Sequence, residues 1–232
     1  MDKNTIAQNI ARETMRELHH IIRVGMSEKE IETHAVELMA RKGSNGWWYH
    51  GVGALVLLGE RSVVSLSGRE YYASQENRVS ENDVITIDLA PTVDGFWGDY
   101  ARTIFVEDGK VAPEDAPRSA LFRHGLEAEL HLHRKLVEIA EPEMTYEQLF
   151  FRLNEEITAL GFENLDLHGN LGHSVEMDQA DRIYIERGST RTLRDVGKMF
   201  TFEPHIRPAG GALGFKREDI YFFDASGTLR RL

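Results

Sequence analysis

Two aspartates flank a short hairpin turn near the middle of the sequence. Asp94-Gly95 is a two-residue turn signal, because both positions tolerate the positive φ of a type I′ turn. With this turn, Asp88 and Asp99 fall on one face of the hairpin as diagonal neighbours, with Cα atoms roughly 7–8 Å apart. Carboxylates held this close repel each other unless a proton or a metal ion lies between them. The hairpin therefore indicates a divalent cation site, although an aspartate beside a turn is also a common solvated residue.

Three more side chains of the metal-ligating kind follow in the C-terminal half. They are His173 in a Gly-His-Ser segment, Glu203 in a Phe-Thr-Phe-Glu-Pro segment, and Glu218 in a Phe-Lys-Arg-Glu-Asp segment. Taken alone, a histidine is often structural, and a glutamate beside Lys216 and Arg217 is typical of a solvated charge run. The order Asp, Asp, His, Glu, Glu nevertheless resembles the ligand set of the pita-bread metallopeptidases, the family of methionine aminopeptidase, prolidase and aminopeptidase P. The resemblance extends from about residue 5 to the end of the chain.

The resemblance implies a dinuclear metal centre. The five ligands that it assigns are Asp88, Asp99, His173, Glu203 and Glu218. Asp99 and Glu218 would bridge two divalent ions, while Asp88 would bind one ion and His173 the other. Glu203 would be a further bridging ligand and would also take the proton from a water molecule. Four carboxylates and one imidazole suit Mn, Co, Fe or Zn. The implied reaction is the attack of a metal-bridged hydroxide on an amide carbonyl.

The same resemblance implies an α+β pita-bread fold with two pseudo-symmetric αβ halves, a curved antiparallel sheet and a single catalytic domain over residues 1–232. The sequence contains a faint repeat that agrees with two such halves. Ser27 with Glu30, and Thr145 with Gln148, each predict a capping box at the start of a helix. Both helical patterns close at a glycine suited to the left-handed C′ position. The expected helices cover about Thr5–Ile22, about Pro117–Ile139, and the two segments that close at Gly43 and Gly161.

The sequence departs from the family pattern at two auxiliary histidines. One is expected seven residues after the metal-binding histidine, where this chain has Ala180. The other is expected about eighteen residues before the first metal aspartate, near Glu70. Three other histidines are candidates to replace them as catalytic groups. They are His50 in an aromatic run, His168 shortly before the metal-binding histidine, and His205 two residues after the proposed base.

Composition restricts the class of protein. The chain has 232 residues, no cysteine and a formal net charge of −11. The acidic balance argues against nucleic acid or an anionic membrane as the main partner. No apolar stretch is long enough to span a bilayer, and the polar N-terminus lacks the apolar core of a secretion signal. We therefore expect a cytoplasmic protein. The oligomeric state is left open, with a homodimer as one option.

The strand segment that begins at Asp99 resembles the proline-directed branch of the family more than methionine aminopeptidase. The first hypothesis is therefore an aminopeptidase or Xaa-Pro dipeptidase-like hydrolase acting on a short peptide. A second is hydrolysis of a small non-peptide C–N bond, as in creatinase and ectoine-hydrolase relatives, because both auxiliary histidines are missing. A third is a catalytically weak binding protein, although five retained ligands argue against it.

Overall fold

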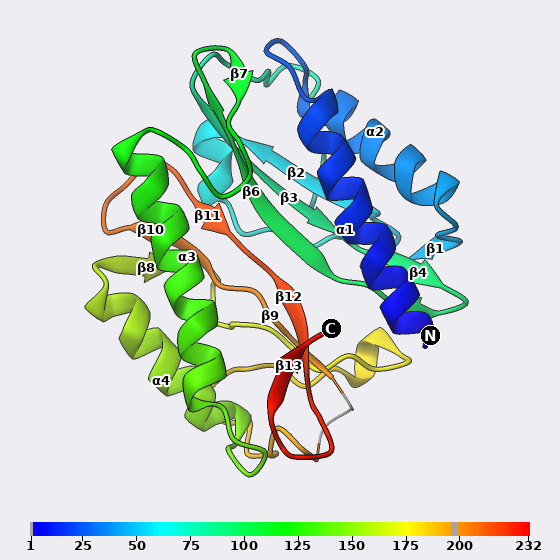
Figure 1. Ribbon diagram of the computed structural model, residues 1–232, viewed down its shortest axis with the longest axis vertical. Coiled ribbons are helices and arrows are strands. Elements are labelled where there is room, and N and C mark those ends of the chain that lie inside the picture. Colours follow the sequence, from blue (N-terminus) through cyan, green and yellow to red (C-terminus); the bar gives the residue numbers. More distant parts are fainter. Residues whose placement is uncertain (1, 196–198) are drawn as a thin grey trace.

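The computed structural model describes residues 2–195 and 199–232 and contains two pairs of helices, one in each half of the chain (Figure 1). The first pair lies over the sheet at the upper right of Figure 1, and the second pair lies at the lower left. Both pairs consist of a longer helix followed by a helix of 14 residues. The helices are α1 (Lys3–Ile21), α2 (Glu28–Arg41), α3 (Ala120–Ile139) and α4 (Tyr146–Ala159).

The strands of the N-terminal half form two small antiparallel sheets. One has the order β2-β3-β6-β7 and the other the order β1-β4-β5. The strands are β1 (Gly46–Trp47), β2 (Ala54–Leu58), β3 (Asp83–Leu89), β4 (Pro91–Val93), β5 (Phe96–Trp97), β6 (Tyr100–Glu107) and β7 (Lys110–Val111), with a 3-10 turn at Gly59–Val63.

The strands of the C-terminal half also pair antiparallel, in the orders β11-β10-β8 and β13-β12-β9. These strands are β8 (Phe162–Asn164), β9 (Phe200–Phe202), β10 (His205–Pro208), β11 (Phe215–Lys216), β12 (Asp219–Phe223) and β13 (Leu229–Arg231), with a 3-10 turn at Gln179–Asp181. The mixture of helices with antiparallel sheets is the expected α+β class.

The repeated helix starts are confirmed as capping boxes. Ser27 caps α2 and Thr145 caps α4, and in both cases the third helical residue bonds back to the backbone of the cap. Gly43 and Gly161 follow the last turns of these helices with φ of 105° and 79°. These backbone angles require glycine because a Cβ atom disfavours the left-handed region. The local sequence thus sets both ends of each helix.

The hairpin register is confirmed both beside the turn and in the sheet beyond it. Asp94 and Gly95 have φ of 52° and 82°, as a type I′ turn requires. Val93 pairs with Phe96 beside the turn, and Asp88 pairs with Ala101 in the sheet beyond it. Asp99, two residues before Ala101, therefore lies diagonally across from Asp88 on the same face of the hairpin.

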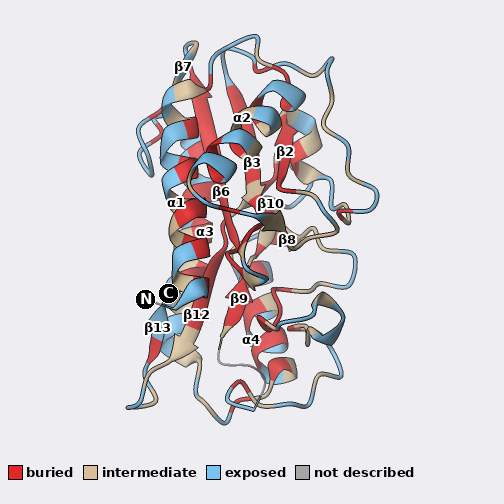
Figure 2. Ribbon diagram, turned by 90° about the vertical axis from the view of Figure 1, so that its right-hand side faces the viewer, coloured by how far each residue is buried: buried red, intermediate tan, exposed pale blue. Residues whose placement is uncertain are grey.

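Each half has its own large hydrophobic core, and Figure 2 shows that the strands are mostly buried while the outward faces of the helices are exposed. One core joins α1 and α2 to the first sheet, and the other joins α3 and α4 to the strands of the second half. Gly125 on α3 permits especially close packing, because a Cβ atom there would lie 2.3 Å from the ring of Phe215. That contact brings α3 directly onto β11.

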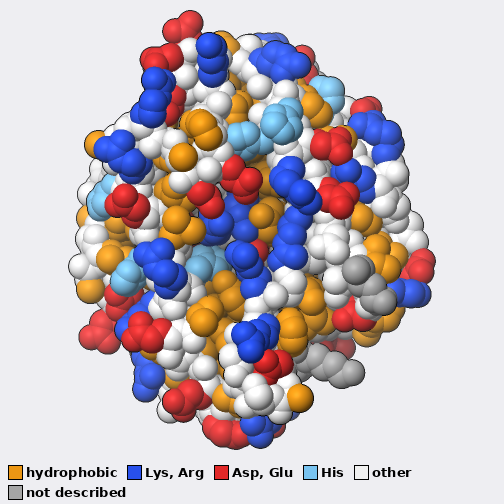
Figure 3. Space-filling view, viewed as in Figure 1, with side chains coloured by type: hydrophobic (Ala, Val, Ile, Leu, Met, Phe, Trp, Pro, Cys, Tyr) orange, Lys and Arg blue, Asp and Glu red, His pale blue; other side chains and the backbone are white. Residues whose placement is uncertain are grey.

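Acidic and basic side chains are interspersed over the face of the molecule seen in Figure 3, so the net charge is not gathered there into one patch of a single sign. Within the described ranges, no helix is long and apolar enough to cross a membrane.

Candidate metal centre

The structure brings all five proposed ligands together between the two halves. Two groups of three side chains have ligand atoms that lie within 4.8 Å of one another. We call Asp99, His173 and Glu218 the first cation position, and Asp88, Glu203 and Glu218 the second cation position. Because Glu218 belongs to both, the two positions share a carboxylate, which is the arrangement that a dinuclear centre needs.

Asp99 is held by the first helix of the chain. Gln8 on α1 is buried, and its amide accepts a hydrogen bond from the backbone N–H of Asp99 at 2.7 Å while donating one to the Asp99 carbonyl at 2.9 Å. Both backbone groups of Asp99 are therefore satisfied, although this residue lies just outside β6. The contact fixes the backbone at the point where the carboxylate enters the first cation position.

The His173 ring is oriented by its own neighbour. Its Nδ1 lies 2.9 Å from the backbone oxygen of Ser174, which can only accept, so Nδ1 carries the proton. Nε2 is then an acceptor, and it lies 3.6 Å from Oδ2 of Asp99 and 3.8 Å from Oε1 of Glu203. A histidine whose second nitrogen bonds a carbonyl is the usual form of a metal ligand.

Glu218 is completely buried, and its backbone is bonded on both sides. Its N–H donates to the carbonyl of Ala101 at 2.9 Å. Its carbonyl accepts from Nη1 of Arg102 at 2.7 Å. The shared ligand is therefore fixed to β6, the strand that follows Asp99.

Burial raises the pKa of the Asp99, Glu203 and Glu218 carboxyl groups, and neighbouring acidic groups raise these pKa values further, although the charge of Lys216 opposes the rise for Glu203. Burial and then the charge of Arg182 lower the pKa of His173 to about 3. The environment thus disfavours the ionised forms of Asp99 and Glu218 and the charged form of the imidazole when no metal ion is bound. Metal binding at such a site releases protons.

The donor atoms fit a metal. Among the described residues, Oδ2 of Asp99 and both carboxylate oxygens of Glu218 are buried without a hydrogen-bond partner. Buried polar atoms are normally satisfied, and orphaned oxygens indicate a missing ion or water. The residues present therefore suit a divalent ion with a preference for oxygen and nitrogen ligands.

Four of the five proposed ligands, Asp88, Asp99, His173 and Glu203, line a pocket of about 420 Å³. Trp48, Tyr49 and Tyr184 form an aromatic wall, and Trp48 stacks on Trp97 with ring centroids 4.6 Å apart. The guanidinium of Arg182 lies 5.1 Å from the ring centroids of Trp48 and Tyr184. Its Nε donates to the backbone of the 3-10 turn at 3.0 Å. The positively charged side chain of Arg182 thus lies over the aromatic wall and faces the pocket.

A second pocket cation was missed by the sequence reasoning. Nζ of Lys216 lies 2.5 Å from Oδ2 of Asp88 and 3.1 Å from Oε2 of Glu203. The neighbouring Arg217 instead pairs with Asp115 at 3.0 Å. Strand alternation predicts that Lys216 and Arg217 face opposite sides, but it does not predict which distant carboxylates they contact. Lys216 thus lies on the same side of the chain as the proposed ligand Glu218, which follows it by two positions.

Comparison with known proteins agrees with this geometry. The sequence pattern of metallopeptidase family M24 matches residues 2–225. The chain belongs to metallopeptidase family M24.

The curated relatives of this M24 chain include two Xaa-Pro dipeptidases. The enzyme of Pyrococcus furiosus is 26% identical over 207 residues, which are 89% of this chain and 53% of the relative. The enzyme of Lactobacillus helveticus is 28% identical over 143 residues, which are 62% of this chain and 36% of the relative. The chain therefore spans about half, or less, of the length of these relatives.

Solved structures confirm the pita-bread fold of the M24 chain. The X-Pro aminopeptidase of Thermotoga maritima superposes with a TM-score of 0.80 at 23% identity, over 99% of this chain and 59% of the other. The methionine aminopeptidase of Thermotoga maritima superposes with a TM-score of 0.77 at 16% identity, over 99% of this chain and 94% of the other.

The three replacement histidines occupy different places. His168 and His205 line the pocket. Nε2 of His205 lies 2.6 Å from the backbone oxygen of Ser62, and burial followed by the nearby lysine lowers the pKa of His205 to about 4. His50 is not among the lining residues, and its Nε2 lies 3.0 Å from Nε2 of Gln179.

The positions of the absent family histidines also differ from each other. Glu70 lines the pocket, and its Oε2 accepts from the hydroxyl of Ser67 at 3.2 Å. Ala180 lies in the 3-10 turn and is not among the lining residues. Thus one of the two positions still presents an ionisable side chain to the pocket.

Proposed function

We propose that the chain is a hydrolase with two divalent ions that cleaves the amide bond of a short Xaa-Pro substrate, in the manner of an aminopeptidase or dipeptidase. The observation that carries this proposal is the pair of cation positions that share Glu218, whose other members line the pocket. Family membership and the Xaa-Pro dipeptidase relatives support the reaction class. Asp88, Asp99, His173, Glu203 and Glu218 are the proposed ligands.

When bound, two divalent ions would lower the pKa of a water molecule and polarise the amide carbonyl. Glu203 is the proposed acceptor of the proton from that water, and its membership of the second position and of the pocket lining supports this role. Burial raises the pKa of Glu203 toward the range of a general base. The adjacent His205 and the more distant His168 are the candidates for carrying the proton onward.

The pocket contains complementary groups for a small zwitterion. Arg182 offers guanidinium N–H groups to a carboxylate, the pairing that arginine forms most strongly. Trp48 and Tyr184 offer apolar ring surface beside it, which suits a proline ring. A volume of about 420 Å³ lies in the range of small-ligand sites and admits a dipeptide more readily than a long chain.

The test is a substrate panel on protein stripped with chelator and reloaded with Mn²⁺. We expect metal-dependent release of proline from Xaa-Pro dipeptides, and a loss of about 10²–10⁴-fold in kcat for Glu203→Gln. Glu163→Gln is the matched control, because Glu163 pairs with Arg207 outside the pocket. Failure of every Xaa-Pro dipeptide with two ions bound would reject this substrate class.

Arg182→Gln refines the test of the carboxylate contact. Loss of a hydrogen-bonded charge contact of roughly 1.5–3 kcal/mol raises KM by about 10–100-fold, with a smaller change in kcat. An Xaa-Pro amide, which lacks the carboxylate, should be cleaved equally well by wild type and variant. A uniform fall in kcat for both substrates would contradict the assignment.

A second candidate substrate is a small non-peptide amide, favoured by the absence of histidine at Ala180 and Glu70. Turnover of creatine-like or ectoine-like amides, without turnover of dipeptides, would decide for it. Manganese as the native ion, a cytoplasmic location, a homodimer and a single domain over residues 1–232 remain proposals from the sequence.

A further inference from the structure

The positively charged side chain of Lys216 contacts the second cation position but not the first. Its Nζ contacts Asp88 at 2.5 Å and Glu203 at 3.1 Å, and these are two of the three members of the second position. Its side chain is only 17% exposed. The first position has no such contact with a lysine or arginine in the part of the chain that the structure describes. The two positions therefore differ in their internal charge.

The backbone of Lys216 cannot retreat from the site. The hydroxyl of Thr103 on β6 accepts from the Lys216 N–H at 2.8 Å and donates to its carbonyl at 3.1 Å. His205 on β10 pairs with it from the other side. Any movement of the ammonium away from the carboxylates must therefore come from the side chain alone.

Space for that movement exists beside the site. A cavity of about 60 Å³ adjoins Lys216 and is lined in part by Thr86, Asp88 and His205. A water molecule takes up roughly 30 Å³ in the liquid, so a cavity of this size can admit a displaced ammonium. Polar groups in its wall are available to the ammonium after the move.

We propose that Lys216 selectively weakens cation binding at the second position, because an incoming ion must displace its ammonium from Asp88 and Glu203. The first position fills without that displacement. The inference rests on the proposed two-ion centre and is independent of the peptide substrate. The ammonium thus sets the order in which the centre fills and makes occupancy of the second position depend on the supply of metal.

The charge of Lys216 gives the displacement a physical cost. In the empty site, the ammonium neutralises one of the three carboxylates of the second position. An ion entering there meets a resident positive charge and must separate it from two partners before it gains the same oxygens. Two like unit charges a few ångströms apart repel strongly in a partly buried site.

The test is calorimetric titration of chelator-stripped protein with Mn²⁺ alone. Wild type should bind in two steps, and Lys216→Met should tighten the weaker step by at least about tenfold while leaving the stronger step within about threefold. Lys216→Arg should resemble wild type, because the charge is kept. Lys135→Met is the matched control, since Lys135 forms an ion pair on the surface of α3.

Double variants show which cation position corresponds to the weaker binding step. Lys216→Met is combined with a substitution that damages either the first or the second position. In His173→Ala, where the first position is damaged, Lys216→Met should still tighten the remaining site. In Asp88→Ala, the same substitution should have little effect, because the second position is already lost. If wild type takes up a single ion, Lys216→Met should take up two.

The proposal would be overturned if Lys216→Met tightened both binding steps equally, or if it left the weaker step unchanged or weakened it. It would also be overturned if wild type and Lys216→Met both bound one ion, or both bound none. Circular dichroism of the stripped variants checks folding, and Lys216→Gln replaces Lys216→Met if the latter does not fold. Two bound Mn²⁺ ions without dipeptide turnover would reject the proposed substrate and leave this inference intact.

Discussion

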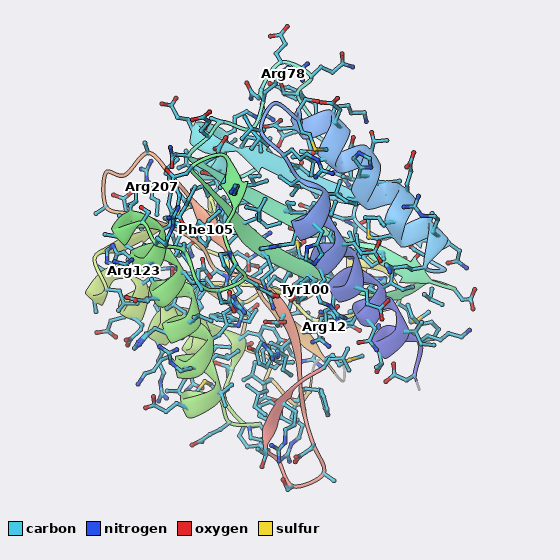
Figure 4. All side chains as sticks on the ribbon, turned by 45° about the horizontal axis from the view of Figure 1, so that its top comes forward. Arg12, Arg78, Tyr100, Phe105, Arg123 and Arg207 are labelled. Atoms are coloured by element: carbon cyan, nitrogen blue, oxygen red, sulfur yellow. The ribbon has the colours of Figure 1, made fainter. Side chains whose placement is uncertain are left out.

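Nη2 of Arg102 lies 3.0 Å from both carboxylate oxygens of Asp219, and this buried ion pair joins β6 to β12 directly behind the metal centre. Arg12 from α1 approaches the same carboxylate at 3.9 Å. Its guanidinium lies 5.9 Å from the ring centroid of Tyr100, and Figure 4 shows these two labelled residues side by side. The strands on either side of the shared ligand are thus tied together on the face opposite the pocket.

Arg102→Met should therefore be strongly destabilising. It leaves the Asp219 carboxylate buried beside weaker partners, and breaking one side of a buried pair typically costs about 3–5 kcal/mol. Urea denaturation of the metal-free protein measures the loss in the free energy of unfolding. We expect the shared ligand to be misplaced as well, so Mn²⁺ binding should weaken.

Arg78→Met is the control for that experiment. Arg78 pairs with Glu30 at 3.3 Å, both side chains are more than half exposed, and Figure 4 labels Arg78 at the periphery. An exposed pair contributes about 0–1 kcal/mol. Equal losses of stability in the two variants would show that the buried pair has no special role.

The two aspartates near the turn should respond differently to the same change. Asp99→Asn should lower Mn²⁺ content sharply, because Asp99 belongs to the first cation position. Asp94→Asn should leave the metal content unchanged, because Asp94 lies at the exposed turn, bonded to Lys3 and Asn45, and asparagine tolerates its positive φ. Elemental analysis of both variants decides the matter, and similar metal loss in the two would contradict the assigned site.

Removal of metal should also lower the melting temperature. Ions that bind only the folded state stabilise it by mass action. Differential scanning calorimetry with and without EDTA should show a lower transition in EDTA for wild type and a much smaller difference for Asp99→Asn.

The missing auxiliary histidines should make Xaa-Pro turnover slow. A positioned proton-transfer group contributes about 10²–10⁴-fold, and of the three candidates only His168 and His205 line the pocket. Alanine at either of these should lower kcat, with the larger loss for His205, whereas His50→Ala should have the smallest effect. Rapid turnover that survives all three substitutions would show that no histidine has taken over the role.

The stability of the metal-free protein should depend on the neutral form of His133. Its Nε2 lies 3.1 Å from the carbonyl of Arg217, so Nε2 carries the proton and Nδ1 accepts from the Tyr221 hydroxyl at 2.8 Å. Burial, opposed in part by Asp219, lowers the pKa of His133 to about 3. The unfolded chain, with a histidine pKa of about 6.5, therefore binds the proton first as the pH falls.

This stabilising contribution is fully present above about pH 6.5 and is lost as the pH falls toward 3. His133→Gln should lose part of that pH dependence, so that wild type and variant converge in stability as the solution is acidified. Thermal melts in EDTA across this range measure the difference. A constant difference between the two proteins from pH 7 to pH 4 would rule out this role for His133.

Local signals in the sequence predicted what depends on local chemistry. Asp94-Gly95 predicted both the turn and its register, because few residues accept positive φ at two successive positions. Ser27 and Thr145 predicted two helix starts to the residue, because a capping box is made within four residues of chain. The same hairpin predicted that Asp88 and Asp99 lie close together, whereas the convergence of His173, Glu203 and Glu218 on them came from the family resemblance.

The cations of the pocket depend on contacts between distant segments. Lys216 looked like part of a charge run with Arg217, yet Lys216 ends β11 and pairs with Asp88, whereas Arg217 lies in the gap before β12 and pairs with Asp115. Arg182 follows a 3-10 turn, where neither helical nor strand periodicity applies. Its approach to Trp48 joins positions more than a hundred residues apart, and such a contact leaves no periodic trace in the sequence.

The two-residue turn also limits how this chain can change its length. Side chains in a strand alternate between faces, so a shift of register by one residue reverses the face of every position beyond it. An unbulged insertion at Asp94-Gly95 would turn Asp99 away from Asp88 without altering a single proposed ligand. Substitutions at the turn are thus far safer than insertions, and a count of conserved metal-binding residues would overlook a variant disabled in this way.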